Sequence, residues 1–423
     1  ANGNVRAVFA GHIHRMRYDG KRDGIDYYTL AATGGRLEFE LPGAGYLHEF
    51  HVVTVRPDDI TIATLPVGAV IDPQQITGQV SEDVDRLVEK LRPKAIKGLK
   101  FRADGGVLGT LSLRLENPVN RPIDVTVGAS GDESWTFTPD HTHATLGPKE
   151  ARTFELHARR RTDLGTPPRL PRLAIDCDYL AENLRLSIPR VERTVQMPAP
   201  KGLQEICATA ERANAPQRAL QLAAPNSCGR IPASAIALPD GPMTVEAWLR
   251  GSSFSGKRKI VSKAQDGEFH LSITDGAVSF MLHLDGSYRG ATTDPVLKPN
   301  GWHHVAGVFD GKEVRIYVDG RLLARNPAEG SRTTNTVALL VGAEPDAKSK
   351  PTSGFAGQLA EVRISSTARY ADDAFEPPTQ HEPDAHCELL LRCQQDAGSW
   401  ILDSSSHGRH ATPVGDARLT LRQ

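Results

Sequence analysis

Two histidines near the start of the chain have the spacing of metal ligands. His12 and His14 flank one residue in the segment Gly11-His12-Ile13-His14, which follows a short apolar run at residues 5–10. Side chains two positions apart on an extended backbone share a face, so both imidazoles can point at one metal centre. Neutral imidazole is the commonest nitrogen donor to zinc, iron and manganese. A bare His-x-His is more often a structural pair, and that alternative stays open.

The elements around this pair favour the metal interpretation. A polar loop (residues 15–24), a strand (25–32), a Gly34-Gly35 turn and a hairpin (48–55 with 60–65) follow in order. This order of elements, with Gly-His-x-His after the first strand, resembles the C-terminal end of calcineurin-like metallophosphoesterases. The resemblance implies that His12 and His14 each ligate one of two divalent metal ions, in a site that hydrolyses phosphate mono- or diesters.

The same resemblance implies that the metal site is incomplete in this chain. The family's earlier ligands (an Asp-x-His, a Gly-Asp, a Gly-Asn-His and a further His) would precede Ala1. Two imidazoles do not hold a dinuclear centre, which needs bridging carboxylates and several more donors. We therefore expect a phosphate ester as the substrate of a longer parent protein, no hydrolysis by this chain alone, and no identifiable catalytic residue.

Two further histidine pairs have a weaker pattern. His141 and His143 repeat the His-x-His spacing near a predicted turn, but no acidic or cysteine ligand accompanies them at a recognisable distance. His48 and His51 are three positions apart and so fall on opposite faces of a strand. For both pairs we expect structural or solvent-facing roles.

Composition limits the class of protein. The chain has 423 residues, with Lys plus Arg 50 and Asp plus Glu 51, so its net charge of -1 offers no electrostatic case for nucleic acid or an anionic membrane. No apolar run of about 18 residues occurs, so no membrane span is expected. Gly 38 and Pro 29 suit short strands joined by many turns. The five cysteines lack zinc-like spacing; we expect buried free thiols, with Cys207 and Cys228 as the one pairing to consider.

The strongest secondary-structure signal lies in residues 302–323. Val305, Gly307 and Phe309 alternate with other side chains, and a second alternating run covers residues 314–318. Asp-Gly pairs at 310–311 and 319–320 supply the positive φ angles of tight hairpins. The segment therefore predicts three antiparallel strands with one apolar face, which needs a second sheet to cover it.

This hairpin carries a second family resemblance. Together with Met-Thr-Val-Glu-Ala-Trp-Leu at 243–249 and Gly-Gln-Leu-Ala-Glu-Val-Arg-Ile-Ser at 357–365, it resembles the laminin-G-like, concanavalin A-like jelly rolls over residues 219–370. The resemblance implies a two-sheet sandwich that serves as a carbohydrate- or protein-binding module. Another type of antiparallel sandwich is the alternative.

Within this domain we consider two kinds of ligand site. Tyr288 and Arg289, in a predicted loop, combine an aromatic ring with a planar cation and are candidates for contact with a sugar. Asp266, Asp285 and Asp294 could supply oxygen ligands to Ca²⁺, although no Asp-x-Asp-x-Asp loop specifies such a site.

Two tryptophans lie on predicted strands of the jelly roll, Trp248 beside Glu246, and Trp302 at the start of the hairpin. We expect both rings to be buried between the two sheets, because large aromatic side chains dominate protein cores. A sugar-stacking platform is the alternative.

The chain as a whole is expected to be mainly β and multi-domain, with a partial α/β phosphoesterase domain in front of the sandwiches. Residues 81–92 predict the one clear helix, capped by Ser81. The expected divisions are a phosphoesterase fragment (1–75), a linker helix (76–96), an immunoglobulin- or fibronectin-III-like sandwich (97–196), a linker (197–215), the jelly roll (216–372) and a segment that packs on it (373–423).

Two functions of different classes are compatible with these observations. The first is a metal-dependent phosphoesterase of which this chain is the end, carrying accessory domains. The second is a non-catalytic carbohydrate-binding or adhesion module, or a structural stalk, with a glycan or an extracellular protein as partner. The resemblance to extracellular sandwich modules implies an extracellular or periplasmic location.

Overall fold

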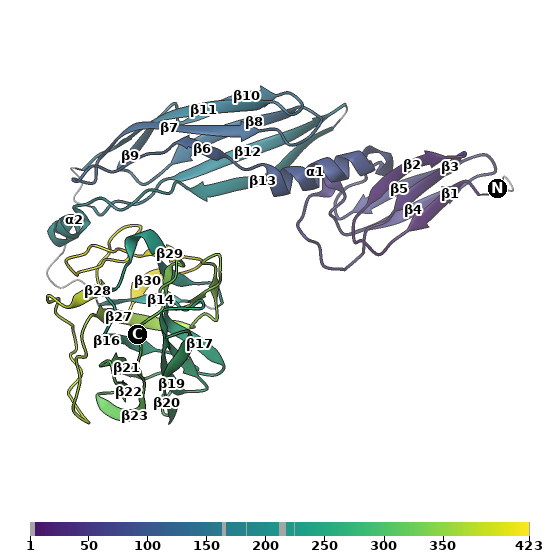
Figure 1. Cartoon of the computed structure of the whole chain (residues 1–423). Helices are drawn as coiled ribbons and strands as arrows, with labels where there is room; N and C mark the ends of the chain where they lie inside the picture. Colours follow the sequence, from purple (N-terminus) through teal and green to yellow (C-terminus); the bar gives the residue numbers. More distant parts are fainter. Residues whose placement is uncertain (1–4, 163–165, 183, 211–216, 224, 423) are drawn as a thin grey trace. The chain divides into compact units, whose positions relative to one another are not determined.

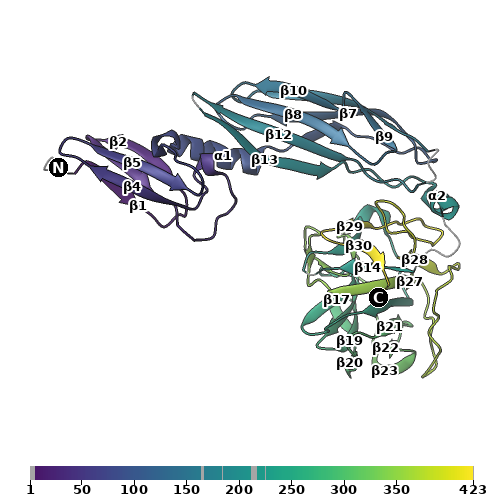
Figure 2. The same ribbon diagram turned by 180° about the vertical axis from the view of Figure 1, so that it is seen from behind.

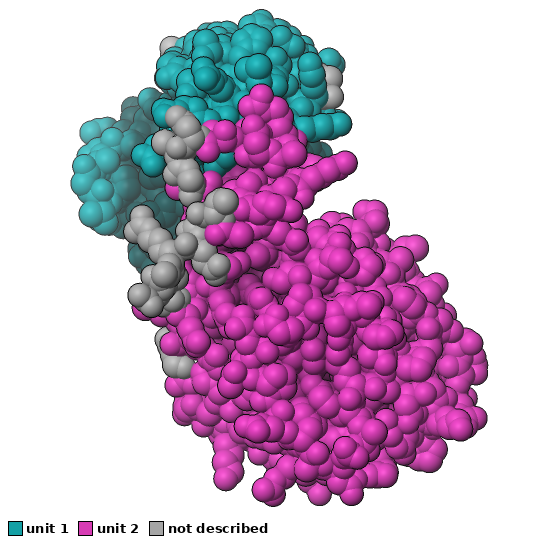
Figure 3. All heavy atoms as spheres, turned by 90° about the vertical axis from the view of Figure 1, so that its left-hand side faces the viewer, with its two compact units in different colours: residues 1–100, 107–161, 170–197 teal, residues 101–106, 162–169, 198–423 magenta. Residues whose placement is uncertain are grey.

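The computed structural model describes residues 5–162, 166–182, 184–210, 217–223 and 225–422. Its elements are labelled in Figure 1 and seen from behind in Figure 2. The chain divides into two compact units (Figure 3). Unit 1 comprises residues 1–100, 107–161 and 170–197, and unit 2 comprises residues 101–106, 162–169 and 198–423. Strands make up most of the regular structure of both units, as the composition predicts.

Unit 1 begins with a small mixed sheet and a hairpin. In the sheet, of order β1-β3-β2, β1 runs parallel to β3 and β2 runs antiparallel to it, and β4 pairs with β5. The apolar core here is small and is built on Met16, Leu47 and Ile76. Phe50 is 58% exposed and Val55 is 71% exposed, so the hairpin shows apolar side chains to solvent. The elements are β1 (Ala7–Ala10), β2 (Arg17–Arg22), β3 (Ile25–Thr29), η1 (Pro42–Ala44), β4 (Glu49–Val55), β5 (Ile60–Pro66) and η2 (Pro73–Gln75).

Helix α1 (Gly78–Lys90) begins three residues before its predicted start. The Thr77 hydroxyl, not that of Ser81, accepts the capping hydrogen bond, from the backbone N–H of Val80. Ser81 lies inside the helix and is buried. The prediction failed because Thr77, four residues earlier, is also a good capping residue.

The rest of unit 1 is a sandwich of two four-stranded sheets. One has the order β10-β8-β12-β13 and the other the order β6-β7-β11-β9. Alternate residues face inward, as in β8, where Ile123, Val125 and Val127 are buried. The strands are β6 (Lys94–Lys97), β7 (Val107–Glu116), β8 (Ile123–Ser130), β9 (Trp135–Thr138), β10 (His141–Leu146), β11 (Ala151–Arg160), β12 (Arg172–Ala181) and β13 (Leu184–Thr194).

Unit 2 is a larger sandwich that follows the short helix α2 (Leu203–Ala210). Sheet 1 has the order β23-β22-β21-β16-β27-β14-β30, with β28 also paired to β27, and sheet 2 has the order β20-β19-β18-β17-β24-β15-β29. The strands of sheet 1 are β14 (Arg218–Leu222), β16 (Met243–Arg250), β21 (Trp302–Phe309), β22 (Glu313–Val318), β23 (Arg321–Pro327), β27 (Gly357–Ser365), β28 (Cys387–Arg392) and β30 (Arg418–Leu421). Those of sheet 2 are β15 (Cys228–Ile231), β17 (Lys257–Ser262), β18 (Phe269–Thr274), β19 (Ala277–Leu284), β20 (Ser287–Pro295), β24 (Leu339–Val341) and β29 (Thr412–Val414). The shorter elements are η3 (Ala233–Ala235), β25 (Glu344–Pro345) and β26 (Pro351–Thr352).

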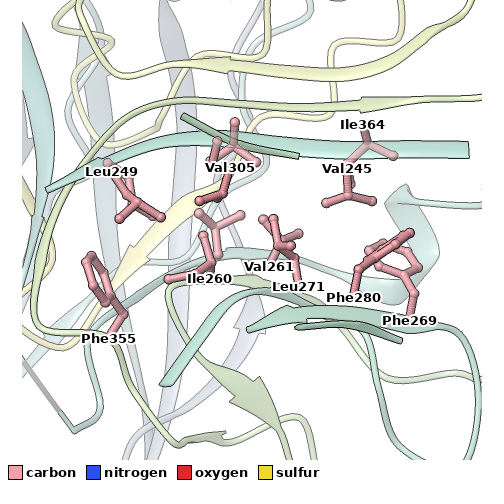
Figure 4. Close-up of a cluster of buried hydrophobic side chains, with 14 of the residues drawn as sticks. Val245, Leu249, Ile260, Val261, Phe269, Leu271, Phe280, Val305, Phe355 and Ile364 are labelled. Atoms are coloured by element: carbon pink, nitrogen blue, oxygen red, sulfur yellow. The ribbon is translucent and has the colours of Figure 1, made fainter. Parts of the chain in front are cut away.

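The three-stranded pattern predicted in residues 302–323 is confirmed as β21, β22 and β23. At the second turn both Asp319 (φ 50°) and Gly320 (φ 76°) have positive φ, as a type I′ hairpin turn requires. Val305 and its neighbours point into the space between the sheets, where they meet side chains such as Phe280 from sheet 2 (Figure 4). This layer is the core of unit 2.

The expectation that Trp248 and Trp302 lie between the sheets is wrong. Val245, Ala247 and Leu249 of β16 face the core, so Trp248 points to the outer face, where its Nε1 donates to the carbonyl of Pro378 at 2.9 Å. The Arg422 guanidinium lies 4.2 Å from the centre of the Trp302 ring. Residue parity along a strand, not the size of the side chain, decides which face a residue takes.

The segment after residue 372 belongs to the sandwich itself. Its strands β28, β29 and β30 pair with β27, β15 and β14, so it contributes to both sheets. Leu389, Leu391, Cys393, Ile401 and Ala411 are part of the core. The segment therefore contributes strands and core residues to the jelly roll itself.

All five cysteines are buried and form no disulfide, which confirms the expectation of buried thiols and excludes the pairing considered for Cys207 and Cys228.

Candidate functional site

The predicted metal ligands His12 and His14 lie in the turn that follows β1. Both have positive φ, 84° and 50°, and both are exposed. They border one hollow together with Phe9 and Leu30, so the structure brings the two rings to the same place. Nδ1 of His14 is 3.2 Å from the carbonyl oxygen of Arg36. Within the described residues, neither histidine belongs to a group of three or more metal-ligand side chains.

His48 and His51 have structural partners. Nε2 of His48 is 2.6 Å from the carbonyl oxygen of Gly35. The ring of His51 lies between Glu49, 2.9 Å from Nε2, and Thr64, 3.0 Å from Nδ1. The His48 contact ties the start of the hairpin to the Gly34-Gly35 turn, and the His51 contacts join β4 and β5 within the hairpin.

His141 and His143 lie on β10 and contact near neighbours. Nδ1 of His141 is 2.8 Å from an Asp140 carboxylate oxygen, and Nδ1 of His143 is 3.1 Å from the Thr126 hydroxyl. Neither belongs to a group of metal-ligand residues in the part of the chain that the structure describes.

Tyr288 lies on strand β20, not in a loop, because the preceding turn closes at Asp285 and Gly286. Its side chain is 41% exposed, yet its hydroxyl donates to the carbonyl of Gly267 at 3.0 Å. The ring packs edge-on against His283, with 4.7 Å between ring centres, and lies 5.9 Å from His270. These rings form a rigid, partly exposed aromatic row on the outer face of sheet 2.

Burial favours the uncharged forms of His270 and Tyr288 in this row. Burial, assisted by the charges of Lys259 and Lys257, lowers the pKa of His270 to about 3. Burial likewise raises the pKa of Tyr288. Nδ1 of His283 is buried and has no hydrogen-bond partner. His270 and Tyr288 are therefore neutral rings at neutral pH, and they lie beside the ring of His283.

Arg289 does not lie beside Tyr288. Successive residues of a strand point to opposite faces, and the Arg289 guanidinium donates to the carbonyl of Glu329 at 3.0 Å. The two residues expected to act together are therefore separated by the sheet.

The three candidate calcium ligands do not form a group. Asp285 accepts a hydrogen bond from the backbone N–H of Ser331 at 3.1 Å, and Asp266 accepts one from the Gln265 amide at 3.3 Å. Among the described residues, the one group of metal-ligand type contains neither of them, nor Asp294.

That group is Glu246, His304 and His381, and the sequence interpretation missed it. Glu246 lies on β16 and His304 on β21, side by side on the outer face of sheet 1, and all three side chains are fully buried. Oε2 of Glu246 is 3.1 Å from Nε2 of each histidine. Oε1 accepts from Nε of Arg363 at 2.7 Å, and the Tyr370 hydroxyl donates to Oε2 at 2.8 Å.

The network continues from His381 to Glu361. Nδ1 of His381 lies 2.7 Å from Oε2 of Glu361, and the His381 backbone N–H donates to the same oxygen at 2.9 Å. Burial opposes charge on Glu246, but its contacts with His304, His381 and Arg363 hold its pKa well below the usual range. The parity of Glu246 and His304 along their strands could have indicated a shared face; the approach of His381 from a distant segment could not.

Residues 226–374 match the family described as the concanavalin A-like lectin/glucanases superfamily, which confirms the predicted laminin-G-like jelly roll. Among solved structures, domains LG4-5 of the mouse laminin alpha1 chain are 14% identical (TM-score 0.31; 68% of this chain and 96% of that chain). The SAP-like pentraxin of Limulus polyphemus is 16% identical (TM-score 0.30; 38% and 80%). Domain 4 of the arabinanase AbnA from Geobacillus stearothermophilus, solved with arabinotriose, is 19% identical (TM-score 0.27; 33% and 67%).

No curated protein matches the chain. The family match does not reach residues 1–75, so the phosphoesterase interpretation of that segment has no support from these comparisons. None of the helices in the described part of the chain has the length and apolar character needed to cross a membrane.

Proposed function

We propose that this chain is a carbohydrate-binding protein whose glycan site is the aromatic row on the outer face of sheet 2, centred on Tyr288. The observation that carries the proposal is the exposed but immobilised Tyr288 ring, on a domain that matches a superfamily of lectins and glucanases. An aromatic ring offers its face to the apolar side of a pyranose. A ring that is already fixed loses little conformational entropy when a ligand binds.

The neighbouring side chains favour a neutral sugar. His270 and His283 flank the ring, and the low pKa of His270, about 3, keeps that imidazole uncharged at neutral pH. Nδ1 of His283 is buried, so this ring supports Tyr288 through its edge-on contact and offers no exposed polar atom to the sugar. Arg289, on the other side of the strand, is not part of this site.

Binding of the full chain to a glycan array, with and without Ca²⁺, tests the proposal. Titration calorimetry with the best ligand then compares Tyr288→Ala, Tyr288→Phe and the matched control Phe50→Ala, an exposed aromatic of unit 1. We expect Tyr288→Ala to weaken binding at least tenfold, about 1.4 kcal/mol. Tyr288→Phe keeps the ring and should weaken binding less, and Phe50→Ala should not change it.

Two results would contradict the glycan proposal. If no glycan is retained in either condition, the protein-binding or stalk alternative becomes the better interpretation. If Tyr288→Ala and the unchanged chain bind the glycan with equal affinity, the glycan site does not include Tyr288. A glycan ligand would also accord with an extracellular or periplasmic location, which we propose on the same basis.

A metal role for His12 and His14 is a second proposal, favoured by their position at one hollow. Two imidazoles alone are too few donors for a dinuclear phosphoesterase centre, so the test is binding, not turnover. Zinc and manganese binding by the double variant His12→Ala/His14→Ala is compared with that of His141→Ala/His143→Ala. The proposal is supported if His12→Ala/His14→Ala loses a metal-binding site that His141→Ala/His143→Ala retains. Identical metal binding by the two variants contradicts it.

A further inference from the structure

The buried group Glu246, His304 and His381 lies beneath one crossing segment, which we name the strap (residues 366–386). The strap passes over the outer face of sheet 1 at β16, β21 and β22. Its Phe375 packs edge-on against His304 of β21 and Tyr317 of β22, with 5.8 Å and 5.4 Å between ring centres, and its Pro378 accepts the hydrogen bond from Trp248 of β16. Sheet 1 supplies Glu246 and His304, and the strap supplies His381.

Two of the three ligand-atom separations are close to those of a zinc site. Oε2 of Glu246 is 3.1 Å from Nε2 of His304 and from Nε2 of His381, and all three atoms lie within 4.8 Å of one another. With zinc–ligand bonds of about 2.0–2.2 Å, neighbouring ligand atoms of a tetrahedral site are about 3.3–3.5 Å apart. The two oxygen–nitrogen separations need to change by a few tenths of an ångström, and the two imidazole nitrogens, which lie within 4.8 Å of each other, need to approach by up to about 1.3 Å for one cation to contact all three.

Hydrogen bonding alone leaves Glu246 Oε2 overcrowded. A carboxylate oxygen has about two lone-pair positions, yet His304, His381 and Tyr370 all converge on Oε2. The two imidazole contacts, at 3.1 Å, are longer than the roughly 2.7–2.9 Å of charge-assisted bonds. A cation between Oε2 and the two nitrogens accounts for both the crowding and the distances.

The second ring nitrogen of His381 fits the same interpretation. Nδ1 is 2.7 Å from Glu361, so the shorter contact of this ring is on the side away from Glu246. A metal-bound histidine commonly donates its other N–H to a carboxylate, which fixes the tautomer and directs the remaining lone pair at the metal. Arg363 occupies Oε1 of Glu246 and leaves Oε2 for the cation.

We propose that Glu246, His304 and His381 bind one divalent cation of the zinc class, which fastens the strap to sheet 1. Two imidazoles and one carboxylate form a donor set that zinc accepts, and calcium, which prefers oxygen, does not suit it. The Tyr370 hydroxyl, 2.8 Å from Oε2, is a further oxygen beside the group. The role is structural, because the three ligands are fully buried and no face is open to a substrate.

The test is metal analysis of the full chain in a His12→Ala/His14→Ala background, so that the exposed pair cannot contribute. We expect one equivalent of zinc after purification, and a tetrahedral Co²⁺ absorption spectrum after exchange. Removal by a chelator should lower the melting temperature by about 5 °C, and zinc should restore it. His304→Gln and His381→Gln should lose the metal, while His303→Gln, the adjacent histidine bonded to Asp319, should retain it.

Two outcomes would overturn the proposal. One is that the full-length chain takes up no stoichiometric zinc or cobalt even after refolding in their presence. In that case hydrogen bonds alone join Glu246, His304 and His381. The other is a bound metal that survives both His304→Gln and His381→Gln. If either variant fails to fold, the cobalt spectrum of the chain with Glu246, His304 and His381 unchanged still tests the proposal. Coordination by two nitrogens and a carboxylate gives a spectrum distinct from oxygen-only coordination.

Discussion

Replacing Gly307 by alanine should destabilise unit 2, because an aromatic ring fills the space that a methyl group would need. Gly307 lies on β21 of sheet 1, and the fully buried Phe280 lies on β19 of sheet 2. A Cβ at position 307 would stand 2.2 Å from Cγ of Phe280 and 2.6 Å from its Cβ. Carbon atoms pack at about 3.5–4.0 Å. The ring cannot move aside by a small rotation, since the contact is at the base of its side chain.

Two opposing effects set the size of the change. Alanine restricts the unfolded chain more than glycine does, which stabilises a protein by about 0.4–1 kcal/mol where the backbone allows it. Forcing an extra carbon into a packed core costs about 1–3 kcal/mol. We expect the packing cost to dominate, so that Gly307→Ala lowers the free energy of unfolding by about 1–2 kcal/mol.

Urea unfolding of the full chain, followed by tryptophan fluorescence, measures this change, since Trp248, Trp302 and Trp400 all report on unit 2. A double-mutant cycle with Phe280→Ala identifies the cause. This background removes Cγ and Cδ1, the atoms 2.2 Å and 2.5 Å from the added methyl group, and leaves a cavity into which the site can relax, so Gly307→Ala should cost less there. An equal cost of Gly307→Ala in both backgrounds would show that the ring is not the obstacle and would refute the reasoning.

Three further predictions concern stability. Thr77→Ala should cost about 1 kcal/mol by removing the cap on the N–H of Val80, measured as a shift of the thermal transition of unit 1; no shift would mean that another group caps α1. Tyr179→Phe should cost about 1.5 kcal/mol in urea unfolding, because the buried carboxylate of Asp83 loses its 2.9 Å hydrogen bond; an unchanged midpoint would contradict this. His270 has a pKa lowered from 6.5 to about 3, so its contribution to stability is complete above pH 6.5 and is lost as pH falls toward 3. His270→Gln should therefore flatten the pH dependence of the melting temperature in that window, and an equally steep decline would contradict the assignment.

The parts of the fold that were predictable follow from local patterns. The alternation in residues 302–323 and its two Asp-Gly pairs specify the strands and turns of β21–β23 before any tertiary contact is considered. The same logic places Glu246 and His304 on the face opposite Val245 and Val305. Local rules also explain the error at Trp248, where size was given more weight than parity.

The candidate metal group could not be predicted, because its third member comes from far away in the sequence. His381 lies in a segment without regular structure, rich in proline and acidic residues, and nothing local marks it as a ligand. Its position depends on contacts that the strap makes along its length, such as the bidentate pair of Arg369 with Asp384. His381 therefore comes close to Glu246 and His304 only in the folded sandwich. The separation of Tyr288 from Arg289 was accessible in principle, once the turn was placed at Asp285-Gly286.

The pairing of β14 with strands made much later has a consequence for biosynthesis. Leu220 pairs with Leu359 on β27 and with Leu419 on β30, about 200 residues further along the chain. At a translation rate of roughly 5–20 residues per second, β14 would wait some tens of seconds for its last neighbour. During that interval the nascent polypeptide exposes an unfinished edge, which makes it a natural client for ribosome-associated chaperones.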